Sequence, residues 1–189
     1  MKVVAFNGSP RPDGNCSLLI KEVFSRFEQH EIQTELVLLN QKKIKPCIAC
    51  YKCLENKDQR CAVNDDLNGC IAEIMKAQAI ILASPTYIGD VNSVTKALID
   101  RAGFVARSNN NMFRRKVAAG LTTASWGGAI HTFETLNLFF LMGEMIVVGS
   151  SNWNLGFGRE KGEVLQDQKA LATVRTLGDN MAWLIKKLQ

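Results

Sequence analysis

Short apolar, β-branched runs recur along the chain, and the stretches between them carry apolar residues at helical spacing. The runs that predict strands cover 3–6, 35–39, 79–83, 117–121 and 145–149. A helical face is clearest near the end, where Leu171, Val174, Leu177 and Met181 fall three or four positions apart. This alternation is typical of βαβ units. We therefore expect one doubly wound α/β domain over residues 1–189, with a five-stranded parallel sheet and helices on both faces.

Only two connections exceed the usual loop length of such a fold. One forms a cysteine-rich insertion at about residues 40–64, and the other covers 150–162 and is rich in Asn, Gly and Trp. No repeat or linker divides the chain. Because the other connections are short, we expect these two long loops to carry functional residues.

Four of the six cysteines, Cys47, Cys50, Cys53 and Cys61, form the pattern C-x2-C-x2-C-x7-C. A chain of 189 residues buries enough core to fold without disulfides, and its start lacks the apolar stretch of a secretory signal. We therefore expect a cytoplasmic protein, in which a cysteine cluster indicates metal binding or thiol chemistry. The compact run is typical of iron-sulfur ligation, whereas structural zinc usually takes two separated pairs. Free thiols or adventitious zinc remain the alternative.

Charge and hydropathy argue against two classes of partner. The net charge of +5 includes a denser patch at Arg101, Arg107, Arg114, Arg115 and Lys116, which we interpret mostly as solvated surface. Aromatic residues are not interleaved with it, so nucleic-acid binding is not expected. The longest apolar stretch, 136–148, is too short and too polar for a membrane span. Cys70 is predicted to be a buried apolar residue, and no Ser, His and carboxylate set favours hydrolysis.

Three loops follow predicted strands and carry small, polar and aromatic residues. The first, 7–17, suits a phosphate because it combines Gly8 and Gly14 with hydroxyls, an arginine and a helix start. The alternative is an ordinary turn with Asn15 as N-cap. The second, 83–90, and the third, 122–128, carry Tyr87, Trp126 and several glycines or hydroxyls. Carboxyl ends of neighbouring parallel strands meet at one sheet edge, so we expect the three loops to border one crevice.

These motifs carry a resemblance to a known family. Residues 8–11 (GSPR) with 15–17 (NCS), and 84–87 (SPTY) with 96–101 (KALIDR), resemble the NADPH-dependent FMN reductase group of flavodoxin-like proteins. With the four cysteines between them, the chain most resembles the iron-sulfur flavoprotein family. The resemblance implies a flavodoxin-like fold with strand order 2-1-3-4-5.

The same resemblance implies two cofactors and their ligands. The FMN phosphate would be held by Ser9, Arg11, Asn15, Cys16 and Ser17, with Cys16 contributing mainly its backbone N–H. The isoalloxazine ring would lie along Pro85, Thr86, Tyr87, Ile88 and Gly89, and Ser125, Trp126, Gly127 and Gly128 would close the site. Cys47, Cys50, Cys53 and Cys61 would hold a [4Fe-4S] cluster.

The resemblance also implies an oxidoreductase. The protein would transfer electrons between a carrier such as ferredoxin or NAD(P)H and an acceptor by way of FMN, as a homodimer or homotetramer. FMN would perform the chemistry, so no catalytic side chain is expected. Two alternatives stay open: a cluster-free NAD(P)H-dependent FMN or quinone reductase, and a zinc-stabilised or thiol-sensing binding module.

Overall fold

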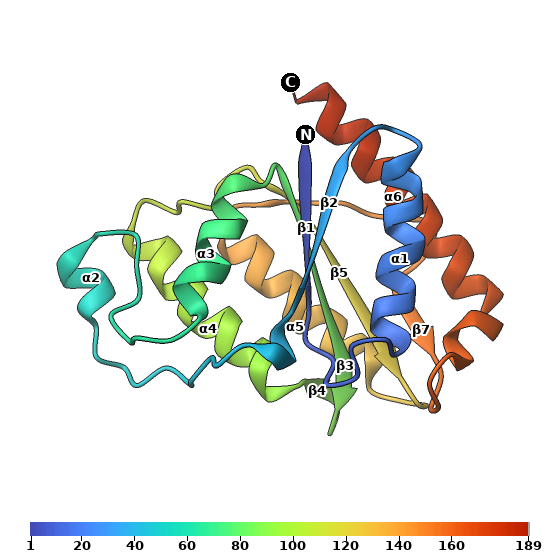
Figure 1. The fold of residues 1–189 in the computed structure, drawn as a ribbon, viewed down its shortest axis with the longest axis horizontal. Coiled ribbons are helices and arrows are strands. Elements are labelled where there is room, and N and C mark those ends of the chain that lie inside the picture. The colour runs from blue at the N-terminus through green and yellow to red at the C-terminus, as the bar shows by residue number, and fades with distance from the viewer. Residues whose placement is uncertain (189) are drawn as a thin grey trace.

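A mostly parallel sheet lies between two layers of helices (Figure 1) in the computed structural model, which describes residues 1–188. The strands are β1 (Lys2–Asn7), β2 (Gln33–Leu38), β3 (Ala79–Tyr87), β4 (Asp90–Val91), β5 (Val117–Ala124), β6 (Ile146–Val147) and β7 (Leu155–Phe157). The helices are α1 (Asn15–Glu28), α2 (Lys52–Asn56), α3 (Leu67–Lys76), α4 (Ser93–Ser108), α5 (Ala129–Met142) and α6 (Gln168–Lys187). The expected doubly wound α/β class is confirmed.

The sheet has seven strands instead of the expected five. Its main path runs β2-β1-β3-β5-β6, which is the expected order once short β4 is left out of the count. β4 turns back antiparallel on β3. The predicted strand 145–149 contributes only the two residues of β6, and β7 pairs with the far end of β5. The last strand position is thus shared by two short strands, because the chain leaves the sheet between them.

Alternation along the buried strands builds one core on each face of the sheet. Val3 and Ala5 of β1 pack in the core beneath α1 and α6, whereas Val4 and Phe6 pack beneath α3, α4 and α5. Cys70 is 98% buried in the second core, as predicted from its position on α3. Within residues 1–188, no helix combines the length and apolar character that crossing a membrane requires.

Parallel strands place the carboxyl ends of β1, β3 and β5 at one edge, where the three polar loops follow them (Figure 1). The segment between β2 and α3 leaves the sheet and passes over α4, with α2 as its only α-helix. The two features singled out by the sequence therefore occupy different regions, the loops at the strand ends and the cysteines beside α4.

Candidate functional site

The turn after β1 is organised by Asn7, whose side chain is fully buried. Its Oδ1 accepts a hydrogen bond from the Ser9 amide at 2.8 Å, and its Nδ2 donates to Ser17 Oγ at 2.7 Å. Ser17 Oγ in turn donates to the Pro12 carbonyl. Because this hydroxyl proton is engaged inside the turn, Ser17 shapes the loop and leaves anion binding to backbone amides at the start of α1.

Asn15 occupies the first position of α1, and the N-cap is Gly14. The alternative with Asn15 as N-cap is therefore wrong. Its amide group instead makes three hydrogen bonds of 2.9–3.0 Å to the backbone of segment 158–162. Arg11 Nη1 donates to a carbonyl of the same segment at 3.3 Å. This second long loop is thereby fastened beside the first turn.

The thiol of Cys16 is buried against β5, where its Sγ lies 3.1 Å from Thr123 Oγ1. Burial raises the pKa of the Cys16 thiol to about 11, so the side chain stays neutral near pH 7. A neutral, packed thiol offers little to a phosphate. Only the backbone N–H of Cys16 is left for a ligand.

The second and third loops enclose a hollow of about 750 Å³ at the ends of β3 and β5. It is lined by Thr86, Tyr87, Ile88, Gly89, Ser125, Trp126, Gly127 and Gly128. The structure thus brings together four of the residues that the resemblance assigned to the flavin ring and the four assigned to closing the site. Pro85 does not line this hollow but lies within β3, opposite Thr123. The lining of the hollow combines two aromatic side chains with hydroxyls and three glycines, which suits a planar ring with polar edges.

Three threonine hydroxyls fix the second loop from behind. Thr132 Oγ1 on α5 donates to Thr86 Oγ1 at 3.0 Å, and Thr86 Oγ1 lies 3.2 Å from Thr122 Oγ1 of β5. Thr122 and Thr132 are fully buried. This chain of hydroxyls joins β3, β5 and α5 at the floor of the site.

Asn92 connects the first turn to α4. As the N-cap of α4, its Oδ1 accepts hydrogen bonds from the amide and hydroxyl of Thr95. Its Nδ2 donates to the Gly8 carbonyl at 2.5 Å, and its amide donates to Ser84 Oγ at 3.1 Å. Helix α4 therefore begins at the three-loop site.

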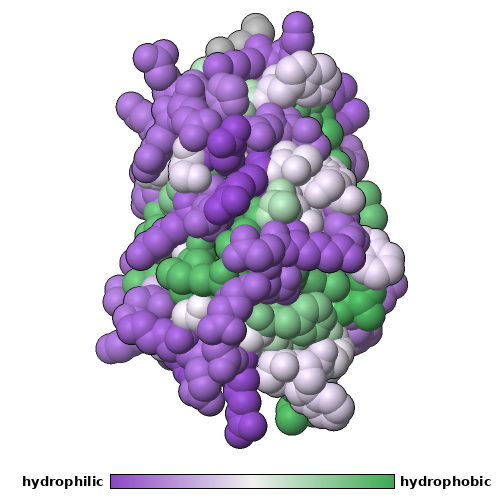
Figure 2. All heavy atoms as spheres, turned by 90° about the vertical axis from the view of Figure 1, so that its right-hand side faces the viewer, coloured by the Kyte–Doolittle hydropathy of each residue, from purple (hydrophilic) through white to green (hydrophobic). Residues whose placement is uncertain are grey.

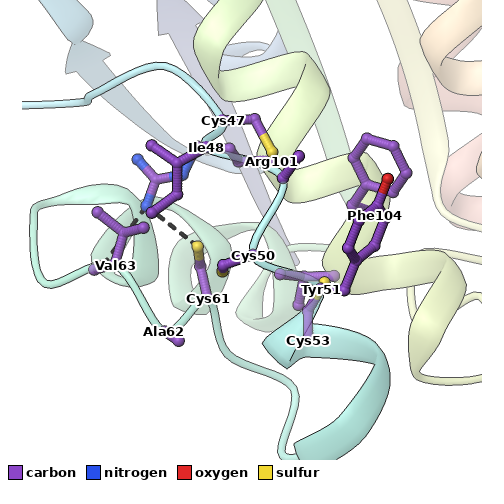
Figure 3. Close-up of a pocket in the computed structure, with 12 residues that line it drawn as sticks. Cys47, Ile48, Cys50, Tyr51, Cys53, Cys61, Ala62, Val63, Arg101 and Phe104 are labelled. Atoms are coloured by element: carbon purple, nitrogen blue, oxygen red, sulfur yellow. Dashed lines mark hydrogen bonds between the residues drawn. The ribbon is translucent and has the colours of Figure 1, made fainter.

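The cysteine segment wraps the exposed side of the same helix two to three turns later (Figure 3). Ala49 and Tyr51 adopt φ of +51° and +55°, so the chain reverses direction around Cys50. Left-handed residues alternating with right-handed ones turn backbone N–H groups toward one side, an arrangement found at many anion and iron-sulfur sites. One cavity of about 60 Å³ is lined by all four cysteines together with Ile48, Ala49, Tyr51, Ala62, Val63, Arg101, Phe104 and Val105.

Arg101 is 99% buried against this cavity, so its assignment to solvated surface is wrong. Its guanidinium pairs with both carboxylate oxygens of Asp65, with Nη1–Oδ2 at 2.6 Å and Nη2–Oδ1 at 3.0 Å. Burial acts to raise the pKa of Asp65, but hydrogen bonds from Arg101 and from the Lys45 and Leu67 amides outweigh it and hold the pKa below its ordinary value. No local pattern marks this pair, because its members are 36 positions apart.

The donor set of the cavity fits a thiophilic metal centre. All four cysteines are free, apolar side chains form most of the wall, and a guanidinium supplies positive charge against thiolates. Among residues 1–188, no three Cys, His, Asp or Glu side chains already converge in ligating geometry. A metal centre here therefore requires cysteine side chains to turn toward one another.

Comparison with known proteins assigns the chain to a family. The sequence profile described as NADPH-dependent FMN reductase matches residues 1–160. An iron-sulfur flavoprotein of Methanocaldococcus jannaschii is 35% identical, with 100% of each chain covered. The chain belongs to the iron-sulfur flavoproteins of the NADPH-dependent FMN reductase family. An iron-sulfur flavoprotein of Methanosarcina thermophila is 30% identical over 80% of this chain and 79% of its own.

Solved structures support the same fold. A flavodoxin-type, WrbA-like protein of Agrobacterium tumefaciens superposes with a TM-score of 0.65 at 18% identity, covering 100% of this chain and 98% of its own. An archaeal flavodoxin gives a TM-score of 0.64 at 14% identity, covering 98% and 99%. The flavodoxin-like fold is thereby confirmed. Family membership makes this iron-sulfur flavoprotein homologue an FMN-dependent redox protein.

Proposed function

We propose that the protein relays electrons between a carrier such as ferredoxin or NAD(P)H and an acceptor, using FMN at the strand ends and a [4Fe-4S] cluster on the cysteine segment. The observation that carries this proposal is the convergence of Cys47, Cys50, Cys53 and Cys61 on one cavity. When bound, the cluster supplies single-electron transfer, and FMN supplies exchange between one-electron and two-electron steps.

In the proposed FMN site, the first turn holds the phosphate. Backbone amides at the start of α1 point at the anion, and the sequence-assigned Ser9, Arg11, Asn15, Cys16 and Ser17 all lie in or at the end of that turn. Tyr87 and Trp126, whose side chains are 50% and 87% exposed, line the hollow that would hold the ring. Backbone amides of the loop 86–89 then orient the polar edge of the ring.

Helix α4 gives the two proposed cofactor sites a fixed spacing. Its N-cap, Asn92, contacts the first turn, and Arg101 contacts Cys61. Nine residues of helix separate them by about 14 Å along the helix axis. A helix that packs one face on the sheet keeps this spacing constant.

The proposal also covers the cellular compartment and the oligomeric state of the protein. We place this single FMN-binding domain, residues 1–189, in the cytoplasm, where thiols stay reduced. We also propose a homodimer or homotetramer. Large apolar side chains that would favour association are exposed on α5 and on the loops beside it, namely Trp126, Leu138, Leu141, Met142 and Trp153. The opposite face, with α1 and α6, is largely hydrophilic with a hydrophobic band across its middle (Figure 2).

The test is the composition and spectrum of anaerobically purified protein. We expect flavin absorbance plus a broad band in the violet, with about four irons and four sulfides per chain. Serine in place of Cys47 or Cys61 should abolish iron binding and leave flavin bound, because the FMN site lies elsewhere. The matched control is Cys70→Ala, which removes a buried thiol outside the cavity. Flavin without iron in the wild-type protein would contradict the cluster and favour a cluster-free NAD(P)H-dependent reductase.

A further inference from the structure

One buried guanidinium joins both ends of the cysteine segment to helix α4. Arg101 Nη1 donates to the Lys45 carbonyl at 2.9 Å, two residues before Cys47. Its Nη2 donates to Cys61 Sγ at 3.1 Å, at the other end of the segment (Figure 3). Cys61 is the cysteine separated from the others by seven residues, so it depends most on contacts outside the compact run.

Cys61 is held by its backbone as well as by its sulfur. Its amide donates to Asn68 Oδ1 at 2.8 Å, and Asn68 Nδ2 donates back to the Cys61 carbonyl at 2.9 Å. The two-point contact with α3 fixes the main chain, and the bond from Arg101 then selects the direction of the sulfur. Among residues 1–188, no protein group donates a hydrogen bond to the sulfur of Cys47, Cys50 or Cys53.

One hydrogen-bond donor of Arg101 has no partner in the described part of the chain. This donor is the buried Nε, whereas both terminal nitrogens donate to Asp65. An unpaired buried donor destabilises the folded protein, because it has lost its hydrogen bond to water. An acceptor bound in the cavity that Arg101 lines would satisfy this N–H, and a sulfur-rich anionic group matches its charge.

We propose that Arg101 is a positioning residue, which orients Cys61 as a cluster ligand and raises the reduction potential of the cluster through its N–H···S hydrogen bond. The inference rests on the proposed function of the cysteine segment. Hydrogen bonds to ligand sulfurs and nearby positive charge stabilise the added electron, and they hold ligands in ligating orientation. Asp65 orients the guanidinium and keeps the pair electrically balanced.

The experiment compares three variants with wild-type protein, all purified anaerobically. Arg101→Gln combined with Asp65→Asn replaces the ion pair by two neutral amides and so leaves no buried charge without a partner. Arg101→Lys retains the charge but loses the fork of donors. Arg107→Gln, on the exposed side of the same helix, removes one positive charge as a matched control. The readouts are melting temperature, iron and sulfide per chain, rate of iron loss to a chelator, and midpoint potential from the visible spectrum.

We expect the double variant to lose iron about 10–100-fold faster than wild type and to show a more negative potential. Arg101→Lys should lose iron as fast as the double variant does, but its reduction potential should lie between those of the double variant and wild type. Arg107→Gln should match wild type in both iron loss and reduction potential. Wild-type-like iron retention and potential in a folded double variant would overturn the inference, as would full recovery of both by lysine. Failure of the proposed function looks different, since wild-type protein itself would then contain no iron or sulfide.

Discussion

The buried amide of Asn7 shapes the first turn from beneath, through bonds to Ser9 and Ser17. Asn7→Ala would leave a buried amide N–H and a buried hydroxyl without their partner. We expect a loss of about 1–3 kcal/mol in unfolding free energy and at least about tenfold weaker FMN binding, because the anion-binding amides lose their fixed geometry. Urea unfolding and fluorescence titration of the flavin-free protein with FMN measure the two effects.

Asn40→Ala is the comparison for this prediction. Asn40 Nδ2 also bonds the first turn, at the Pro10 carbonyl, but at an exposed position. Its removal should cost less than about 0.5 kcal/mol. If Asn7→Ala and Asn40→Ala bind FMN equally well, Asn7 does not organise the site.

Two adjacent glycines allow a test of backbone strain, because an alanine would be strained at only one of the two positions. Gly128 has φ +78°, and a Cβ there would lie 3.0 Å from Gly89 Cα. Gly127 has ordinary φ and open space around an added Cβ. Gly128→Ala should cost about 1–2 kcal/mol and weaken FMN binding, since the two ring loops are pushed apart, whereas Gly127→Ala should leave stability unchanged and weaken FMN binding less. Equal FMN affinities of the two variants would refute this.

Sequence reasoning found residues that are recognisable by type and missed those that act through burial. Cysteines at close spacing and glycines after strands are visible in any linear pattern. Asn7 bonds within its own turn and gains its importance from complete burial, and Thr132 bonds to Thr86, 46 positions earlier, so no local pattern marks either residue. Arg101 was grouped with surface arginines because its counterion, Asp65, lies 36 positions earlier.

At the scale of elements, α4 links the two proposed sites, and Asn92 is the residue at its start. Asn92→Ala removes the helix cap and the bond to the Gly8 carbonyl together. We expect a loss of about 1–2 kcal/mol and weaker FMN binding. Asn92→Ser should restore most of the stability, because serine also caps helices, but it is too short to reach Gly8. A serine variant with wild-type FMN affinity, measured by the same titration, would show that the Gly8 contact is dispensable.

The long elements were predictable and the short ones were not. β1, β3 and β5 are buried apolar runs, and α1, α3, α4 and α6 have clear apolar faces. β4 has two residues and β7 has three, so neither period nor length distinguishes them from loop, while β6 keeps only two residues of the predicted strand 145–149. These short strands form only by pairing with the long strands, β4 with β3, and β6 and β7 with β5.

At the scale of the molecule, the arrangement separates the cofactor sites from the elements that stabilise the fold. α1 and α6 close one face, while α3 to α5 close the other and also carry Arg101 and Asn92. Changes in α6 should therefore alter stability with little effect on either cofactor, whereas changes at the start of α1 also reach the proposed phosphate site. Changes in α4 should alter both.

The stability of the protein in acid tests the ion pair that links β1 to α3. Glu73 on α3 pairs with Lys2 of β1 at 2.7 Å and with Lys76 at 2.8 Å, and these hydrogen bonds lower the pKa of Glu73 to about 2. Since the unfolded-state pKa is near 4.5, the pairing stabilises the fold fully above pH 4.5 and is lost as the pH falls toward 2. Glu73→Gln should therefore be less stable than wild type by about 1 kcal/mol at pH 7.

The difference between Glu73→Gln and wild type should shrink when urea unfolding is repeated at pH 5, 4 and 3. Glu28→Gln serves as the control, because Glu28 is exposed on α1 and forms no ion pair among residues 1–188. Its stability should follow that of wild type throughout. A difference for Glu73→Gln that stays constant or widens in acid would mean that the link between α3 and β1 does not depend on the charge of Glu73.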